Sequence, residues 1–292
     1  MDQRMRKIYR DSQRLNVDEN TKIVIMSDCH RGDGEWNDNF AENEKIYFTA
    51  LRDYYKNGYT YVELGDGDEL WENKDYRKII QLYSHIFWLL SQFYREGRLY
   101  MIYGNHDRQK KSTRFIKKYM SEYYYEAENR YLSLFPKIEI KEGLVLKLTC
   151  CDMQRTILLV HGHQNELLND QLWILAKWMV RYIWKPLEIL GINNPLTATG
   201  NYSTKPKRPN KVEQWAEEKK QLTIGGHTHR PLCPGSELET YYFNSGSCVH
   251  PRCITAIEIE GRNLRLVKWY VDVDSDNHLL VKKEVLMQHY LM

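Results

Sequence analysis

Five short apolar runs, each stopping at a polar cluster, constrain this chain most strongly. The runs are rich in Val, Ile, Leu and Tyr, as β-strands are, and each following cluster carries Asp, Asn or His. The runs cover residues 22–26, 59–64, 98–103, 156–160 and 221–224, and the clusters read SDCHRGDG, GDGDELWE, GNHDR, HGHQNE and GGHTHRP. Uninterrupted apolar strands of this kind predict a largely parallel sheet that is buried on both faces.

Helix-like segments separate several of these runs. Residues 41–56 and 74–96 are the clearest, and the second has apolar residues near helical spacing. Strands that alternate with helices indicate an α/β fold. Ligands of such sheets bind beyond the carboxyl ends of the strands, so we expect the polar clusters to meet at one edge.

The pattern changes after residue 240. Residues 241–249, 254–261 and 263–273 look like consecutive antiparallel strands, the last two joined by a turn at Glu260–Asn263. The tail after residue 276 is ambiguous. We therefore expect one domain over residues 1–292 that combines parallel and antiparallel strands.

Residues 165–220 interrupt the alternation and predict a helical insertion or lid within that domain. Residues 170–190 have the pattern of an amphipathic helix, with basic residues stacked on one face at Lys177, Arg181 and Lys185. Residues 194–211 resemble a basic loop. A basic amphipathic helix favours interfaces, so peripheral membrane contact through 170–190 and plain core packing both remain open.

Seven side chains in the polar clusters are candidate metal ligands: Asp28, His30, Asp66, Asn105, His161, His227 and His229. Seven ligands exceed the needs of one tetrahedral zinc ion and suit two divalent ions that share a bridging carboxylate. The mixture of oxygen and imidazole ligands favours Mn²⁺, with Fe and Zn²⁺ as alternatives, over Ca²⁺.

Three further residues beside these clusters are candidates for substrate binding. Arg31 and Arg108 directly follow cluster residues, where a guanidinium suits a phosphate, although an ion pair elsewhere in the protein is an alternative. His163 follows His161 by two residues and suits a substrate contact, an outer-shell contact or the surface.

Other residues of the clusters receive structural interpretations. Asp68 and Glu69 resemble a solvated or capping pair. Cys29 lies between two candidate ligands and should point away from them as a buried thiol, because side chains alternate along an extended chain.

The run D-x-H, G-D, G-N-H-D, H-G-H and G-H-T-H, over residues 28–229, resembles the calcineurin-like metallophosphoesterases in content and order. The resemblance implies a four-layer αββα sandwich of two sheets flanked by helices. It also implies two metal positions bridged by Asp66, one held by Asp28, His30 and His229 and the other by Asn105, His161 and His227.

The same resemblance assigns catalytic roles. His106 would contact the phosphate or protonate the leaving group, and Asp107 would orient it. A hydroxide bridging the two metals would attack phosphorus in line, so the expected activity is metal-dependent phosphoester hydrolysis.

A subgroup resemblance is narrower. GNHDRQK, the insertion, and residues 243–259 are similar to the UDP-diacylglucosamine pyrophosphatases, which cleave a lipid-linked pyrophosphate beneath a helical lid. This chain has HGHQ where that subgroup carries HGD. A phosphorylated small molecule or a bulky, lipid-linked pyrophosphate is therefore the expected substrate.

Composition limits the alternatives. A net charge of +3 gives little support to nucleic acid as a partner. The six scattered cysteines, the N-terminus without a secretory pattern, and the lack of a long apolar run predict a cytoplasmic protein, with a peripheral position at the membrane as the alternative. Two rival functions remain: a protein or nucleotide phosphatase or phosphodiesterase, and a non-catalytic scaffold, which predicts gaps in the ligand set.

Overall fold

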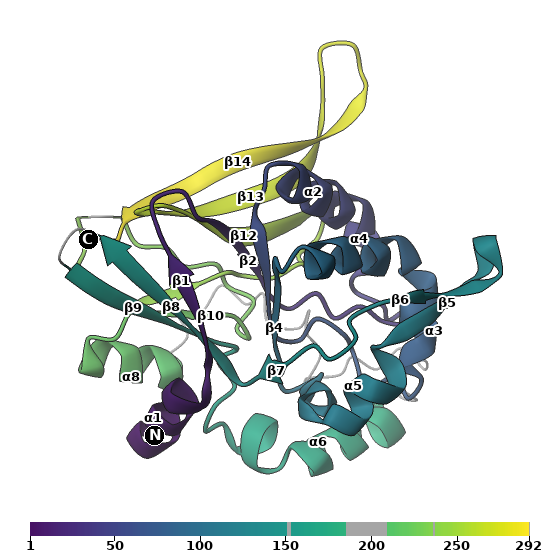
Figure 1. Ribbon diagram of the computed structural model, residues 1–292, viewed down its shortest axis with the longest axis horizontal. Coiled ribbons are helices and arrows are strands. Elements are labelled where there is room, and N and C mark those ends of the chain that lie inside the picture. Colours follow the sequence, from purple (N-terminus) through teal and green to yellow (C-terminus); the bar gives the residue numbers. More distant parts are fainter. Residues whose placement is uncertain (151–152, 185–208, 236, 292) are drawn as a thin grey trace.

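Two β-sheets packed face to face form the centre of the molecule, and helices cover their outer faces (Figure 1). A computed structural model describes residues 1–150, 153–184, 209–235 and 237–291. The layers run helices, seven-stranded sheet, five-stranded sheet, helices. This arrangement confirms the predicted α/β class and the four-layer αββα sandwich.

The seven-stranded sheet has the order β14-β13-β12-β2-β3-β4-β7. Its strands are β2 (Lys22–Met26), β3 (Thr60–Leu64), β4 (Leu99–Ile102), β7 (Ile140–Lys141), β12 (Cys253–Glu260), β13 (Asn263–Val273) and β14 (Leu279–Tyr290). The strands from β2 to β7 are parallel, and β12, β13 and β14 join antiparallel. The predicted β12–β13 hairpin is confirmed, with Glu260 opposite Asn263.

The five-stranded sheet has the order β1-β8-β9-β10-β11. Its strands are β1 (Gln13–Val17), β8 (Gly143–Cys150), β9 (Met153–Val160), β10 (Thr223–Gly225) and β11 (Tyr242–Asn244), and β5 (Glu122–Tyr125) and β6 (Arg130–Ser133) form a separate hairpin. The prediction for 241–249 was wrong, because β11 pairs in parallel with β10 and not with β12.

Helices cover the outer face of each sheet. On the seven-stranded sheet lie α2 (Glu44–Lys56), α3 (Tyr76–Leu82), α4 (Ser84–Arg95) and α5 (Thr113–Tyr119); on the five-stranded sheet lie α1 (Asp2–Asp11) and α8 (Lys211–Lys219). Short 3₁₀ turns occur at Ala41–Asn43, Arg108–Lys111 and Glu126–Glu128. The segment 74–96 is two helices, which separate at Tyr83.

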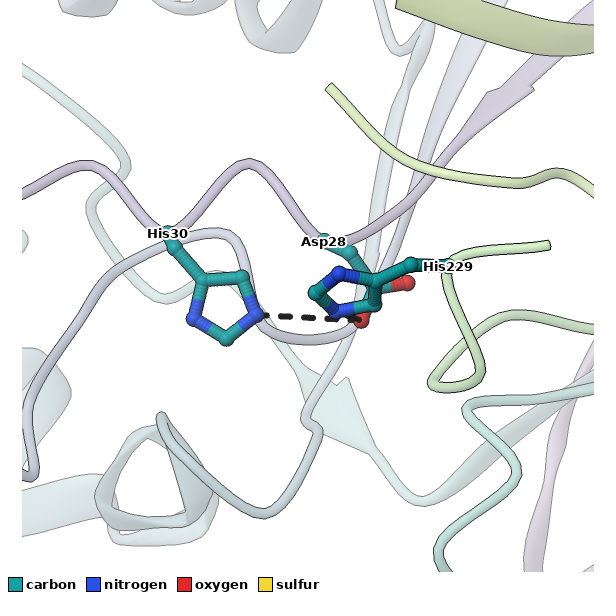
Figure 2. A group of neighbouring side chains, drawn as sticks. All are labelled: Asp28, His30 and His229. Carbon is teal, nitrogen blue, oxygen red and sulfur yellow. Dashed lines mark ion pairs between the residues drawn. The ribbon is translucent and has the colours of Figure 1, made fainter. Parts of the chain in front are cut away.

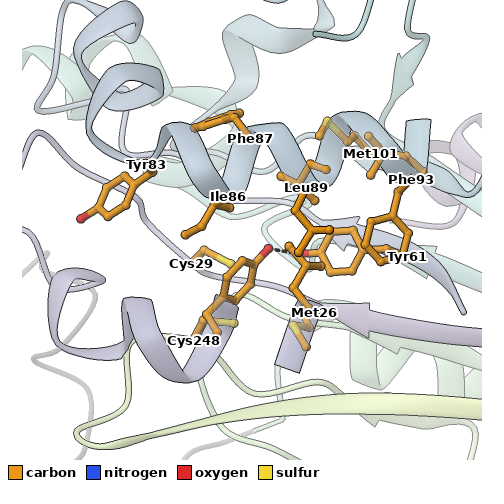
Figure 3. Close-up of a cluster of buried hydrophobic side chains, with 14 of the residues drawn as sticks. Met26, Cys29, Tyr61, Tyr83, Ile86, Phe87, Leu89, Phe93, Met101 and Cys248 are labelled. Carbon is orange, nitrogen blue, oxygen red and sulfur yellow. Dashed lines mark hydrogen bonds between the residues drawn. The ribbon is translucent and has the colours of Figure 1, made fainter. Parts of the chain in front are cut away.

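Strand β2 shows why the apolar runs are continuous. Ile23 and Ile25 pack between the two sheets, whereas Val24 and Met26 pack under the helices of the seven-stranded sheet. Both faces of the strand are therefore buried, as the sequence predicts. Cys29 lies in the same helix-side core as Met26 (Figure 3), which confirms that its thiol points away from the polar side chains beside it.

The predicted insertion is only partly described. It contains α6 (Trp173–Met179) between π-helical turns at Leu167–Gln171 and Val180–Trp184. Lys185 and residues up to 208 lie outside the described residues. Helix α8, placed within the predicted insertion, instead packs on the five-stranded sheet as part of the core. None of the helices in the described ranges is long and apolar enough to cross a bilayer.

A buried ion network fastens the loops after β3 and β4 to each other. The Lys110 ammonium lies 3.1 Å from Glu63, 2.6 Å from Asp68 and 2.7 Å from Asp107. The Arg31 guanidinium pairs with Glu63 and Asp68 from the β2 side. All five side chains are almost completely buried. The ammonium therefore occupies the centre of three carboxylates that would otherwise repel one another in a low-dielectric interior.

We expect Lys110→Met to lower the free energy of unfolding by roughly 3–5 kcal/mol, because Asp107 loses its ion pair and Glu63 and Asp68 are left to the Arg31 guanidinium. Urea unfolding of the metal-free protein measures this change. Lys117→Met, at an exposed position of α5, is the control and should alter stability by no more than about 0.5 kcal/mol. A loss for Lys110→Met as small as that of the control would contradict the role of the network.

Candidate metal centre

The candidate ligands come from loops that follow β2, β3, β4, β9 and β10. Backbone hydrogen bonds join these loops: Asp28 N–H donates to Gly65, His30 N–H to Asp66, and Gly226 N–H to His161. Five of the seven candidates have left-handed backbone conformations, with φ between 47° and 65°: Asp28, His30, Asp66, His227 and His229. Such strain in non-glycine residues is typical of functional sites, where surrounding structure enforces it.

One half of the centre is formed by Asp28, His30 and His229 (Figure 2). Asp28 Oδ1 lies 3.1 Å from Nε2 of His229 and 3.8 Å from Nε2 of His30. Nε2 of His30 is also 3.8 Å from Oδ2 of Asp66. His229 lies within hydrogen-bond distance of Asp28, whereas His30 lies beyond it from both carboxylates, and the ligand atoms of all three residues are close enough to share one ion.

The second half is formed by Asp66, His161 and His227. Nε2 of His161 lies 3.0 Å from Oδ2 of Asp66 and 3.9 Å from Oδ1 of Asp28. Asp66 is therefore near His30 on one side and His161 on the other, as a carboxylate shared between two ions requires.

Unpartnered buried atoms test whether metal ions fit this cluster. Among the described residues, four candidate ligand atoms are buried without a hydrogen bond of acceptable geometry: Asp28 Oδ1, His30 Nε2, Asn105 Oδ1 and His161 Nε2. Buried polar atoms are nearly always paired, so several unpaired ligand atoms in one cluster are typical of a cation site. Carboxylate, amide oxygen and imidazole suit divalent transition metals. The residues thus fit the two metals that the sequence pattern implies.

Outer contacts fix which nitrogen of each imidazole faces the cluster. Nδ1 of His161 lies 2.9 Å from the Leu64 carbonyl, and Nδ1 of His30 lies 2.8 Å from Oε2 of Glu69. In both rings Nε2 is left for a metal, an arrangement common in metal sites. Glu69 is buried, so its interpretation as a solvated residue was wrong, whereas its Oε1 does cap the following turn by accepting from the backbone N–H groups of Trp71 and Glu72. The sequence could not predict its contact with His30, because its position three residues after Asp66 does not determine which way the loop directs the side chain.

His106 lies at the edge of the centre, with 11% of its side chain exposed. Its backbone N–H donates to Asp66, its Nδ1 lies 2.7 Å from Glu69 Oε2, and its ring stacks on Trp71 at 4.1 Å between centroids. Glu69 and Trp71 thus hold the ring that the sequence proposes as catalytic.

Asp107 does not contact the His106 ring, contrary to its predicted orienting role. Its carboxylate accepts hydrogen bonds from the backbone N–H groups of Gly67 and Gly104 and pairs with Lys110. Asp107 therefore shapes the loops, and Glu69 holds the imidazole.

The predicted substrate-binding residues have different surroundings. Arg31 is fully buried and paired with Glu63 and Asp68, so its assignment to phosphate binding was wrong. Arg108 Nη1 donates to the Asp170 carboxylate and carbonyl, while its buried Nε has no hydrogen-bond partner among the described residues.

His163 lies beside the second half of the centre. Its ring centroid is 5.5 Å from that of His161 and 6.4 Å from that of His227, and neither of its buried nitrogens has a partner among the described residues. Burial, together with the nearby His161 and His227, holds the His163 pKa well below its usual range, so the ring is neutral.

The carboxylates of the centre set the charge of its histidines. Burial disfavours the imidazolium of His161, but Asp66 and Asp28 outweigh that effect and raise its pKa to about 9. Burial also opposes ionisation of Asp66, yet His161 and His106 lower its pKa well below the usual range. Without metal, protons on the imidazoles partly balance the buried carboxylates.

One family model and several solved structures are similar to this chain. A model of the calcineurin-like phosphoesterase family matches residues 21–231. A search of curated proteins found no match. Among solved structures, Vps29 of Chaetomium thermophilum is 11% identical with a TM-score of 0.40, and covers 92% of this chain and 98% of its own. A cold-active protein-tyrosine phosphatase of Shewanella is 16% identical with a TM-score of 0.38, and covers 94% and 83%.

The family match extends over most of the chain, from the residue before β2 to the residues after β10. It includes every loop that contributes a candidate ligand. The chain therefore belongs to the calcineurin-like phosphoesterases and is a metal-dependent phosphoesterase, of a family that implies two divalent metal ions.

Proposed function

We propose that the protein hydrolyses a bulky, partly apolar substrate, with a lipid-linked pyrophosphate as the preferred class and Mn²⁺ as the preferred metal. The observation that carries this proposal is the orientation of α6 and the π-helical turn after it. Ile174, Trp178 and Tyr182 are spaced four residues apart and are 67%, 52% and 51% exposed. They form an outward apolar stripe, the reverse of an ordinary surface helix.

The basic side chains of this segment face inward instead. Arg181 donates to the backbone carbonyls of Leu70, Trp71 and Asn73, in the loop that carries Glu69. On the buried side, Ala176 and Val180 pack on Trp71, the residue that stacks on His106. The outward stripe thus lies on a segment anchored to the metal centre, where it is available to acyl chains or a membrane surface.

Residue roles follow from the contacts. Two divalent ions would supply Lewis-acid activation of water and neutralise charge on the phosphoryl group. His106, held by Glu69 and partly exposed, is placed to meet a phosphoryl oxygen or to protonate the leaving group. Arg108 Nε and the neutral His163 ring supply further polar contacts for a substrate.

Asp66→Ala should abolish Mn²⁺-dependent turnover, because it removes the carboxylate shared by both halves of the centre. We expect a loss of at least about 10³-fold. The assay uses metal-stripped protein resupplied with Mn²⁺, and bis-p-nitrophenyl phosphate, p-nitrophenyl phosphate and a UDP-sugar lipid as substrates. Wild-type protein that binds metal yet hydrolyses none of them would contradict the proposed substrate class.

Replacing Ile174 and Trp178 by Ser should lower kcat/KM for the UDP-sugar lipid by about tenfold or more, because each lost apolar contact is worth about 1.5–3 kcal/mol. Turnover of bis-p-nitrophenyl phosphate, which has no acyl chains, should be unchanged. Leu279→Ser, at an exposed apolar position of β14, is the matched control. Equal losses on both substrates would argue against a lipid-facing stripe.

Metal binding should release protons. The raised pKa of His161, about 9 against an ordinary 6.5, keeps its ring protonated at neutral pH, whereas a metal requires the neutral ring. The imidazolium stabilises the metal-free fold fully below about pH 6.5, and this stabilisation is lost as pH rises through about 9. Mn²⁺ affinity should therefore rise by about tenfold per pH unit for each proton released.

Isothermal titration in buffers with different ionisation enthalpies counts those protons. An affinity that is constant between about pH 6.5 and 9 would show that His161 is not a ligand in the neutral form.

A further inference from the structure

The first residues of the insertion reach into the second half of the metal centre. Oε2 of Glu166 lies 3.0 Å from Nε2 of His227. Asn169 donates its amide to the same Glu166 oxygen at 2.6 Å, and its Oδ1 is 3.4 Å from the amide nitrogen of Asn105. Glu166 and Asn169 thus contact two candidate ligands of one half.

These contacts determine which nitrogen of His227 is available. With Nε2 taken by Glu166, only Nδ1 is left to share an ion with Asp66 and His161. On the other side of the centre, Glu69 contacts Nδ1 of His30 and so leaves Nε2 for an ion. A carboxylate that orients a ligand imidazole commonly contributes to metal affinity.

The two orienting carboxylates differ in where they are attached. Glu69 follows β3 in the loop that the buried ion network fastens to the core. Glu166 instead begins the insertion, which carries the outward apolar stripe. The second half of the centre is therefore contacted by residues at the start of the insertion, in the loop that follows β9.

We propose that Glu166 is a positioning residue for the second metal, and that binding of this metal is linked to docking of residues 165–184, the part of the insertion next to the centre. The proposal rests on the two-metal centre of the proposed function but not on its substrate. By linkage, a docked insertion raises the affinity of the second metal, and the bound metal holds the insertion docked to the same degree.

Metal titration tests the first direction. Wild-type protein and Glu166→Gln are stripped and titrated with Mn²⁺ by calorimetry, and the metal content is measured after gel filtration. The variant should bind one Mn²⁺ with unchanged affinity and the other about tenfold to a hundredfold more weakly. Glu142→Gln removes a partly buried carboxylate paired with Arg4 and should bind both ions as the wild type does.

Limited trypsin digestion tests the reverse direction. Cleavage after Lys177 and Arg181, identified by mass spectrometry, reports undocking of the insertion. In the wild type, saturating Mn²⁺ should slow this cleavage several-fold, whereas in Glu166→Gln the protection should be largely lost. Circular dichroism confirms that the variant is folded.

Two results would overturn the proposal. One is that Glu166→Gln binds each of the two Mn²⁺ ions with the same affinity as the wild type does. The other is that Mn²⁺ does not change the rate of tryptic cleavage after Lys177 and Arg181 in the wild type. Both experiments are independent of turnover. Failure of the proposed function through lack of hydrolysis is therefore distinguishable from failure of this linkage.

Discussion

Compensation of buried negative charge is the constraint on which the rest of this structure depends. The ion network and the metal centre together contain six buried carboxylates at the carboxyl edge of the seven-stranded sheet: Asp28, Glu63, Asp66, Asp68, Glu69 and Asp107. Three of them surround the Lys110 ammonium, and the other three face imidazoles. The Lys110 ammonium supplies a built-in positive charge to the first three carboxylates. The group around the histidines contains buried ligand atoms without hydrogen-bond partners among the described residues, and these suit metal ions.

This division explains how the strained backbone of the centre is tolerated. Left-handed conformations at Asp28, His30 and Asp66 cost free energy in residues other than glycine. Hydrogen bonds between the loops after β2 and β3, and the ion network beneath them, over-determine these conformations. The deeper network thereby holds the ligand atoms at positions from which they can share an ion.

The insertion connects two properties that are usually separate. Its outward stripe of Ile174, Trp178 and Tyr182 is the substrate contact of the proposed function, and its first turn places Glu166 against His227. Arg181 and Asp170 anchor the segment to the loops that carry Glu69 and Arg108. The stripe and the Glu166 contact to the second half of the metal centre therefore lie on one short segment, so a substrate bound to the stripe would act on the same segment that holds His227.

Much of the fold and the centre was predictable from the sequence. Every strand that carries a ligand loop was expected within a few residues, because runs buried on both faces are continuous and end abruptly in polar clusters. The later strands were harder. The segment containing β11 has the same local pattern as β12, and only long-range packing decides that it joins the other sheet.

The sequence by itself determined the ligand types, their order, and their position at the ends of strands, because these depend on local spacing and side-chain chemistry. The tertiary structure decided the partners. Arg31 points inward and pairs with Glu63, and the His106 ring contacts Glu69, whereas Asp107 pairs with Lys110. In α6 and the turn after it, apolar side chains face outward and Arg181 faces inward. These outcomes depend on which distant loops meet and on how their charges are balanced after burial, and local sequence carries neither quantity.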